Sequence, residues 1–190
     1  MHKAVFLDKD GTLIEDVPFN VAVDRIRFAP MAFESLRELQ QLGYLLIIIT
    51  NQSGIALGKF EEAAIKQVEY FFEKSFRMHG ILLSGFYYCP HHPNGIVREY
   101  SFECDCRKPK PGLLLKASEA LDIDLERSWM VGDILNDIEA GNLAGCKTIL
   151  INNGNETEWI MSEDRKPGFI ASGLWEAASI IKEQENKTNG

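Results

Sequence analysis

The sequence AVFLDKDGT, residues 4–12, decides the fold class, because a short apolar run stops abruptly at two carboxylates and a glycine. Similar apolar runs recur along the chain, separated by longer amphipathic segments, and this alternation predicts an α/β fold with a parallel sheet. In such sheets ligands bind outside the carboxyl ends of the strands. Residues two apart on a strand point the same way, so Asp8 and Asp10 can face one site.

The remaining apolar runs and amphipathic segments define the expected elements. Five or six strands are expected, at residues 4–7, 45–49, 86–88, 129–131, 148–151 and, most weakly, 169–171. Helices are expected at residues 31–42, 61–78, 111–121, 136–144 and 174–182. We therefore expect a single domain over residues 1–182, with a parallel sheet flanked by helices. The polar tail, residues 183–190, is expected to fray.

Composition narrows the class of protein. The 190 residues are 45% hydrophobic, enough for one sizeable core, and the net charge of -8 without a Lys or Arg run disfavours nucleic acid. No apolar stretch approaches the roughly 20 residues that span a bilayer, and no signal-peptide pattern is visible, so no membrane partner and a cytoplasmic location are expected. Three of the four cysteines cluster with histidines. In a reducing compartment this favours metal binding over disulfides.

Three further motifs fall at strand ends or before a helix. Thr50-Asn51-Gln52-Ser53-Gly54 can offer a hydroxyl and backbone N–H groups to phosphate oxygens, so we expect residues 50–53 to bind phosphate. Arg107-Lys108 brings two cations just before an expected helix. Gly132-Asp133 ends a strand and is followed by Asp137. Several carboxylates facing a phosphate would repel it, which indicates an intervening divalent cation.

These motifs, in this order and over nearly the whole chain, resemble those of the haloacid dehalogenase (HAD) superfamily of phosphotransferases. The resemblance implies a single Rossmann-like domain without a large cap domain. It implies that Asp8 attacks phosphorus, and that Asp10 protonates the leaving oxygen and later deprotonates the hydrolytic water. It also implies that Thr50 and Lys108 bind phosphoryl oxygens. Asp8, the backbone carbonyl of Asp10 and Asp133 are the implied Mg²⁺ ligands.

A loop between the third expected strand and Arg107 carries the clustered cysteines. It reads Cys89-Pro90-His91-His92 and, further on, Cys104-Asp105-Cys106. The pair Cys89 and His91 is separated from the pair Cys104 and Cys106 by a spacer of 12 residues. Three thiolates and one imidazole would complete a tetrahedral zinc site without an open position. The loop resembles that of the heptose bisphosphate phosphatases and the related histidinol phosphate phosphatases. This implies Cys89, His91, Cys104 and Cys106 as ligands of a structural Zn²⁺, with His92 as the competing imidazole.

The same resemblance leads to an expected substrate. Too few residues separate the motifs for a cap domain, so loops must select the substrate, and the implied substrate contact of Arg107 suits a second phosphate. We expect a sugar bisphosphate, D-glycero-D-manno-heptose 1,7-bisphosphate, to lose its 7-phosphate. The 12-residue spacer favours this substrate over histidinol phosphate. Ile134, which stands where the heptose enzymes often carry lysine, keeps the alternative open.

Non-enzymatic proteins share part of the pattern. Receiver domains combine acidic residues, Thr, Lys and Mg²⁺ on a parallel sheet, and a catalytically silent sugar-phosphate binder would bind without turnover. In receiver domains the phospho-acceptor lies on a middle strand, whereas Asp8 and Asp10 follow the first strand here. We therefore expect a monomeric phosphatase that acts on a small phosphorylated metabolite.

Overall fold

A six-stranded parallel sheet forms the centre of the computed structural model, which describes residues 1–189. The strand order is β3-β2-β1-β4-β5-β6. The strands are β1 (Lys3–Leu7), β2 (Tyr44–Asn51), β3 (Leu83–Cys89), β4 (Trp129–Gly132), β5 (Lys147–Ile151) and β6 (Phe169–Ala171). The helices are α1 (Ala32–Gln41), α2 (Ala63–Met78), α3 (Gly112–Leu121), α4 (Leu135–Ala144) and α5 (Leu174–Asn189), with 3-10 turns at Val23–Arg25, Arg98–Tyr100 and Glu163–Arg165. The expected parallel α/β fold is confirmed.

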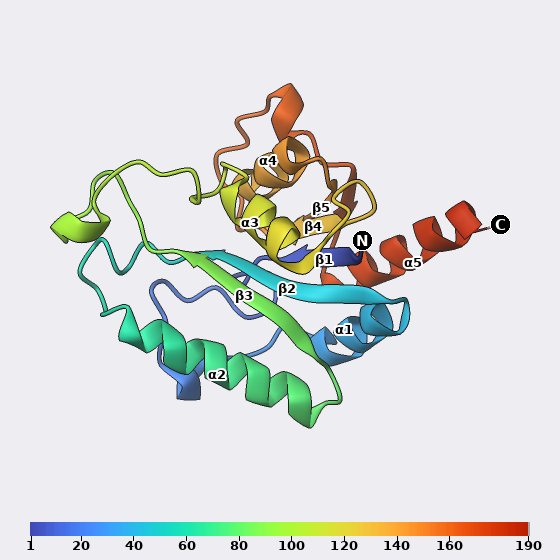
Figure 1. Ribbon diagram of the computed structural model, residues 1–190, viewed down its shortest axis with the longest axis horizontal. Coiled ribbons are helices and arrows are strands. Elements are labelled where there is room, and N and C mark those ends of the chain that lie inside the picture. The colour runs from blue at the N-terminus through green and yellow to red at the C-terminus, as the bar shows by residue number, and fades with distance from the viewer. Residues whose placement is uncertain (190) are drawn as a thin grey trace.

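Helices cover both faces of the sheet (Figure 1). Val5 and Leu7 of β1 pack in one core with α1, α2 and α5, whereas Ala4 and Phe6 pack in the other core with α3 and α4. Successive strand residues point to opposite faces, so a strand buried on both sides is apolar throughout. This explains why residues 4–7 form an uninterrupted apolar run.

The chain changes direction across the sheet between β1 and β4. These two strands are neighbours, with Leu7 in register with Val131, yet the chain builds β2 and β3 on one side and β5 and β6 on the other. The loops that follow β1 and β4 therefore diverge, which opens a crevice at their carboxyl ends. The backbone N–H of Asp8 donates to the carbonyl of Val131 at 2.9 Å, which fixes the start of the first loop.

Three strands extend beyond their expected ends, among them β4, which ends at Gly132. β2 continues to Asn51 and β3 continues to Cys89, and Thr50 and Asn51 pair with Tyr88 and Cys89. Thr50 and Cys89 thus belong to the sheet itself. The sheet therefore supplies Thr50 and Asn51 to the expected phosphate site and Cys89 to the expected zinc site.

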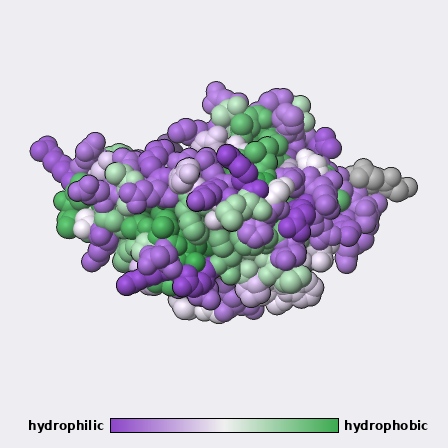
Figure 2. Space-filling view, turned by 90° about the horizontal axis from the view of Figure 1, so that it is seen from below, coloured by the Kyte–Doolittle hydropathy of each residue, from purple (hydrophilic) through white to green (hydrophobic). Residues whose placement is uncertain are grey.

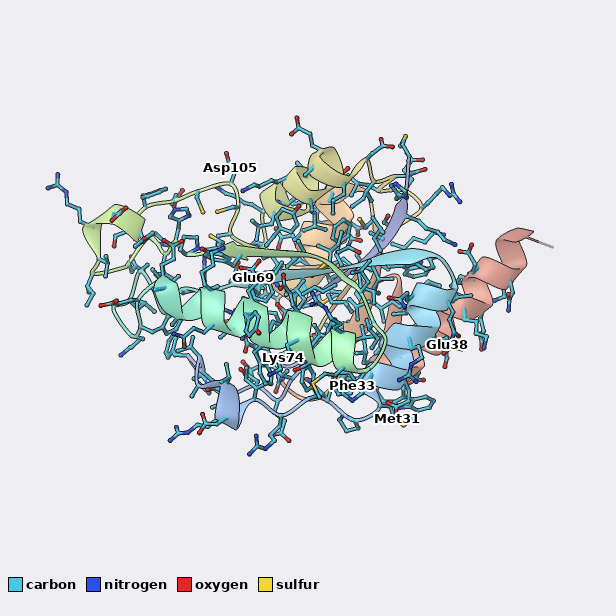
Figure 3. The ribbon with its side chains drawn as sticks, turned by 60° about the horizontal axis from the view of Figure 1, so that its bottom comes forward. Met31, Phe33, Glu38, Glu69, Lys74 and Asp105 are labelled. Atoms are coloured by element: carbon cyan, nitrogen blue, oxygen red, sulfur yellow. The ribbon has the colours of Figure 1, made fainter. Side chains whose placement is uncertain are left out.

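The C-terminal helix is longer than expected. Residues 183–189, where a tail that frays is expected, continue α5, and residue 190 lies outside the described residues. The Glu185 carboxylate accepts hydrogen bonds from Lys3 and, at 2.7 Å, from the Tyr44 hydroxyl. Lys182 pairs with Glu38 of α1, which lies beside α5 (Figure 3). A polar composition suggested a free tail, but these polar groups have partners on β1, β2 and α1.

The surface of the molecule is mixed in character. Seen from below, hydrophilic residues cover most of the visible face, and hydrophobic residues gather in patches between them (Figure 2). Within the described residues, none of the helices combines the length and the apolar character needed to cross a lipid bilayer.

Candidate active site

Three buried carboxylates converge where β1 and β4 end. Asp8 follows β1, Asp133 follows β4, and Asp137 lies in the first turn of α4, with oxygens of all three within 4.8 Å of one another. The sequence motifs predicted Asp8 and Asp133 at one site and gave Asp137 no role. The sequence feature that could have predicted a role for Asp137 is its spacing. A residue four positions after Asp133 lies in the first turn of the helix that follows the strand.

The backbone around the carboxylates is fitted closely. Both the Asp133 and the Ile134 N–H groups donate to Asp137 Oδ2 at 3.2 Å, so this carboxylate caps the start of α4. Asn155 Nδ2 donates to Asp133 Oδ2 at 2.7 Å. Gly11 has a φ of +86°, and a Cβ on it would lie 1.9 Å from Asp133 Oδ2. Only glycine therefore permits this approach of the first loop to the second.

Lys108 lies between the carboxylates. Its Nζ donates to Asp8 Oδ1 at 2.5 Å, to Asp137 Oδ1 at 2.6 Å and to the Ile49 carbonyl at 3.0 Å. Burial alone would lower the pKa of Lys108, but Asp137 and Asp8 outweigh it and hold the pKa above its usual value. The side chain of Asn51 exchanges two hydrogen bonds of 3.0 Å with the backbone of Lys108. The ammonium group is thus both charged and fixed in place.

The electrostatics of the cluster suit a divalent cation. Burial raises the pKa of Asp8 well above its usual value, although Lys108 opposes the shift, and the neighbouring aspartates add to it. Burial, reinforced by Asp137, raises the pKa of Asp133 to about 7. Crowded, desolvated carboxylate oxygens are the donors that Mg²⁺ prefers. The donor set therefore fits Mg²⁺, while the expected role of the Asp10 carbonyl stays a prediction.

The other residues expected at the site lie around this cluster. Asp10 accepts a hydrogen bond from Lys9 at 2.7 Å and one from Gln52 at 3.2 Å. Arg107 lies outside the carboxylate cluster, where its Nη1 donates to Ser53 Oγ at 2.6 Å. The residues expected from the motifs are therefore brought together, with Lys108 inside the cluster and Arg107 at its margin.

Two adjoining cavities of about 190 Å³ each open at the site. The first contains the carboxylates and Lys108, and the second lies between residues 17–20 and residues 51–54. Both are lined by Asp10, Asn51 and Asp16. Sequence analysis missed Asp16, since an acidic residue in a loop carries no motif of its own. A phosphate group in the first cavity would leave the second for the rest of a substrate.

A cluster of sulfur and nitrogen donors lies beside the second cavity. Cys89 Sγ lies 3.0 Å from Cys106 Sγ and 3.5 Å from Cys104 Sγ, and His91 Nδ1 lies 3.3 Å from Cys106 Sγ. Four ligands around a zinc ion with Zn–S bonds of about 2.3 Å would lie about 3.7 Å apart, so the cluster is close to that size. The Cys89 thiol lowers the pKa of Cys106 to about 5, which favours a thiolate.

The cluster also separates residues that the sequence left as alternatives. His92 turns away, and its Nδ1 accepts a hydrogen bond from the N–H of Asn94 at 3.1 Å. Asp105, between two of the thiols, points outward (Figure 3) and its side chain is 98% exposed. Cys146 is buried in the core beneath α3 and α4, as expected. The four expected donors fit Zn²⁺ by their chemistry and spacing.

Comparisons with known proteins agree with this geometry. The sequence matches the model of the HAD-hydrolase-like family over residues 105–177. It is 38% identical over 183 residues to the D-glycero-beta-D-manno-heptose-1,7-bisphosphate 7-phosphatase of Salmonella typhi, and the match covers 96% of each chain. This chain belongs to the HAD-hydrolase-like family. The resemblance stated from the sequence motifs is thereby confirmed.

Other members of this HAD-hydrolase-like family give the same picture. The D-glycero-beta-D-manno-heptose-1,7-bisphosphate 7-phosphatase of Photorhabdus laumondii is 43% identical over 180 residues. The match covers 94% of this chain and 95% of that enzyme. A solved structure, the D,D-heptose 1,7-bisphosphate phosphatase from B. bronchiseptica complexed with magnesium and phosphate, superposes with a TM-score of 0.78. It is 25% identical, and the match covers 97% of this chain and 99% of that one.

The close approach of Gly11 to Asp133 can be tested by substitution. Gly11→Ala should lower the free energy of unfolding through strain at positive φ, about 1–2 kcal/mol, and through the clash with Asp133, about 1–3 kcal/mol more. Gly145→Ala is the matched control, because Gly145 has a φ of +88° and no atom within 4 Å of an added Cβ. Chemical denaturation measures the free energy of unfolding of both variants. If the two variants lose the same free energy, the clash between residue 11 and Asp133 is contradicted.

Proposed function

We propose that this chain is a Mg²⁺-dependent phosphatase that removes the 7-phosphate of D-glycero-beta-D-manno-heptose 1,7-bisphosphate. The similarity to enzymes of that name over 96% of the chain carries the proposal. The position of Asp8, Lys108 and the neighbouring carboxylates at the carboxyl ends of the strands supports it. A receiver domain is disfavoured because Asp8 follows the first strand along the chain, whereas the phospho-acceptor of a receiver domain follows a later strand.

Asp8 is the proposed nucleophile. Lys108 binds Asp8 Oδ1, which leaves Oδ2 to form a bond to phosphorus while the bond between phosphorus and the sugar oxygen breaks. Asp10 gives its proton to that oxygen. A water molecule then attacks the phosphorus of the aspartyl phosphate, Asp10 takes its proton, and Asp8 is released with inorganic phosphate.

Charge on the transferring group is offset by cations. Thr50 and Lys108 bind its oxygens from the first cavity, whose lining includes both residues. Asp8, Asp133 and the carbonyl of Asp10 would hold Mg²⁺, which would supply positive charge against the repulsion between phosphate and carboxylates. The side chain of Asn51 keeps Lys108 in position through the backbone.

Arg107 is proposed to bind the 1-phosphate of the substrate. The second cavity extends from Asp10 to Ser53, and Arg107 donates to Ser53 and, at 3.4 Å, to the carbonyl of His91. A planar guanidinium can bind two phosphate oxygens at once. Arg107 therefore selects a substrate with a second anion, whereas Lys108 serves the phosphate that is removed.

The nucleophile and the substrate are tested together by steady-state kinetics. The wild type should hydrolyse heptose 1,7-bisphosphate with a higher kcat/KM than histidinol phosphate, and Asp8→Asn should lower kcat by more than about 1,000-fold, because the amide is not a nucleophile. Asp24→Asn, an exposed aspartate in a 3-10 turn, is the control. Faster hydrolysis of histidinol phosphate would refute the substrate, and an active Asp8→Asn would refute the nucleophile.

The role of Arg107 predicts a dependence on the second phosphate. Arg107→Ala should lower kcat/KM for heptose 1,7-bisphosphate by about 10- to 100-fold, the value of a charged hydrogen bond, and should change kcat/KM for heptose 7-phosphate much less. Arg98→Ala, an exposed arginine of the same loop, should affect neither substrate. A loss of the same size on both substrates would show that Arg107 does not bind the 1-phosphate.

A structural Zn²⁺ bound by Cys89, His91, Cys104 and Cys106 is the second proposed metal. Purified protein should contain about one zinc per chain, and Cys104→Ser should lose zinc, lower the Tm and raise KM, because zinc holds the loop that carries Arg107. Cys146→Ser should retain zinc. Elemental analysis measures the zinc content, and thermal unfolding measures the Tm. If wild-type protein stripped of zinc keeps the KM and Tm that it has with zinc, the proposal is contradicted.

A further inference from the structure

Gln52 occupies a central place in the site. It is buried, and its side-chain Nε2 donates to Thr50 Oγ1 at 2.8 Å and to Asp10 Oδ2 at 3.2 Å. Its own backbone N–H donates to the carbonyl of Cys89 at 2.8 Å, which ties it to the end of β3. The amide therefore bridges the proposed acid and a proposed phosphate ligand from a fixed backbone.

The direction of these hydrogen bonds follows from the chemistry of the partners. Asp10 Oδ2 is the acceptor of the bond from Gln52, so the amide nitrogen of Gln52, rather than its oxygen, faces Asp10. The other N–H of the same nitrogen reaches Thr50, whose oxygen must accept it. The hydroxyl proton of Thr50 is then free to point into the first cavity, where it can be donated to a phosphoryl oxygen.

Asp10 is also held from its other side. Lys9 Nζ lies 2.7 Å from Asp10 Oδ1, and Lys9 is only 1% exposed. Each oxygen of Asp10 therefore has its own donor, and rotation of the carboxylate would break at least one of the two bonds. Removing Gln52 would leave the carboxylate held only through Lys9.

We propose that Gln52 is a positioning residue that aims the carboxyl group of Asp10 at the leaving oxygen and turns the hydroxyl proton of Thr50 toward the phosphate. This role rests on the proposed phosphatase chemistry. It differs from direct phosphate binding by Gln52, which the sequence motif suggested. Gln52 acts through two neighbours, and its largest effect falls on the step in which the leaving oxygen needs a proton.

The test compares two leaving groups in the full-length protein. Gln52→Met keeps the length of the side chain and removes both donors. It should lower kcat/KM by about 100-fold for an alkyl phosphate such as heptose 1,7-bisphosphate, the size of a general-acid effect. For p-nitrophenyl phosphate, whose leaving group departs without a proton, kcat/KM should fall less than about tenfold. kcat/KM is the right quantity because it excludes the later hydrolysis of the aspartyl phosphate.

Two further variants keep the outcome interpretable. Gln40→Met is the control, because Gln40 bonds the carbonyl of Gly80 and the N–H of Leu82 outside the site, and its kcat/KM should match the wild type. Gln52→Glu, which has nearly the same shape and lacks the amide donors, should repeat the leaving-group dependence if Gln52→Met folds poorly. Chemical denaturation reports the folding of each variant.

Each result decides between the possible roles of Gln52. Equal losses on both substrates would show that Gln52 acts on phosphate binding and does not position Asp10, and unchanged kinetics would show that it has no role. If the wild type hydrolyses a different alkyl phosphate in place of the heptose compound, the proposed substrate fails and the comparison is made with that ester. A wild type that hydrolyses no phosphate ester would refute both proposals.

Discussion

The ion pairs of Lys108 with Asp8 and Asp137 are the interaction on which the site depends. A buried ammonium group is costly unless charged partners surround it, and here two carboxylates and one carbonyl do so. These partners come from the loop after β1, from α4 and from β2. One lysine therefore connects both sides of the crevice, and it offsets repulsion between carboxylates that the fold brings together.

Much of this arrangement could be predicted from the sequence because its causes are local. A strand buried on both faces must be apolar, and the apolar run that stops at Asp8 marks the carboxyl end of such a strand. Contacts between distant segments could not be predicted in this way. The capping role of Asp137, the place of Asp16 between the two cavities and the docking of Glu185 onto β1 and β2 all depend on how separate segments pack.

The loop of the proposed zinc site shows the same division between local and distant causes. Residue type marked the three cysteines and a histidine as candidate donors and the resemblance to related phosphatases singled out His91, because adjacent histidines look equivalent in a sequence. In the structure His91 faces the thiols, and His92 bonds the following turn. Tyr88 and Tyr100 both donate to Glu62 at 2.7 Å, which attaches the loop to the segment before α2. The loop thus has a second anchor that no motif marked.

Arg107 and Lys108 are consecutive residues, yet Lys108 lines the first cavity and Arg107 bonds Ser53, which lines the second. Consecutive Cα atoms lie 3.8 Å apart, a length set by covalent geometry. The hydrogen bonds from Asn51 fix the backbone at Lys108, and the donor cluster ends one residue before Arg107, at Cys106. The backbone positions of the two cationic residues are therefore held at a fixed, short separation. In the proposed reaction, this separation limits how far apart the two phosphates of a single substrate can lie.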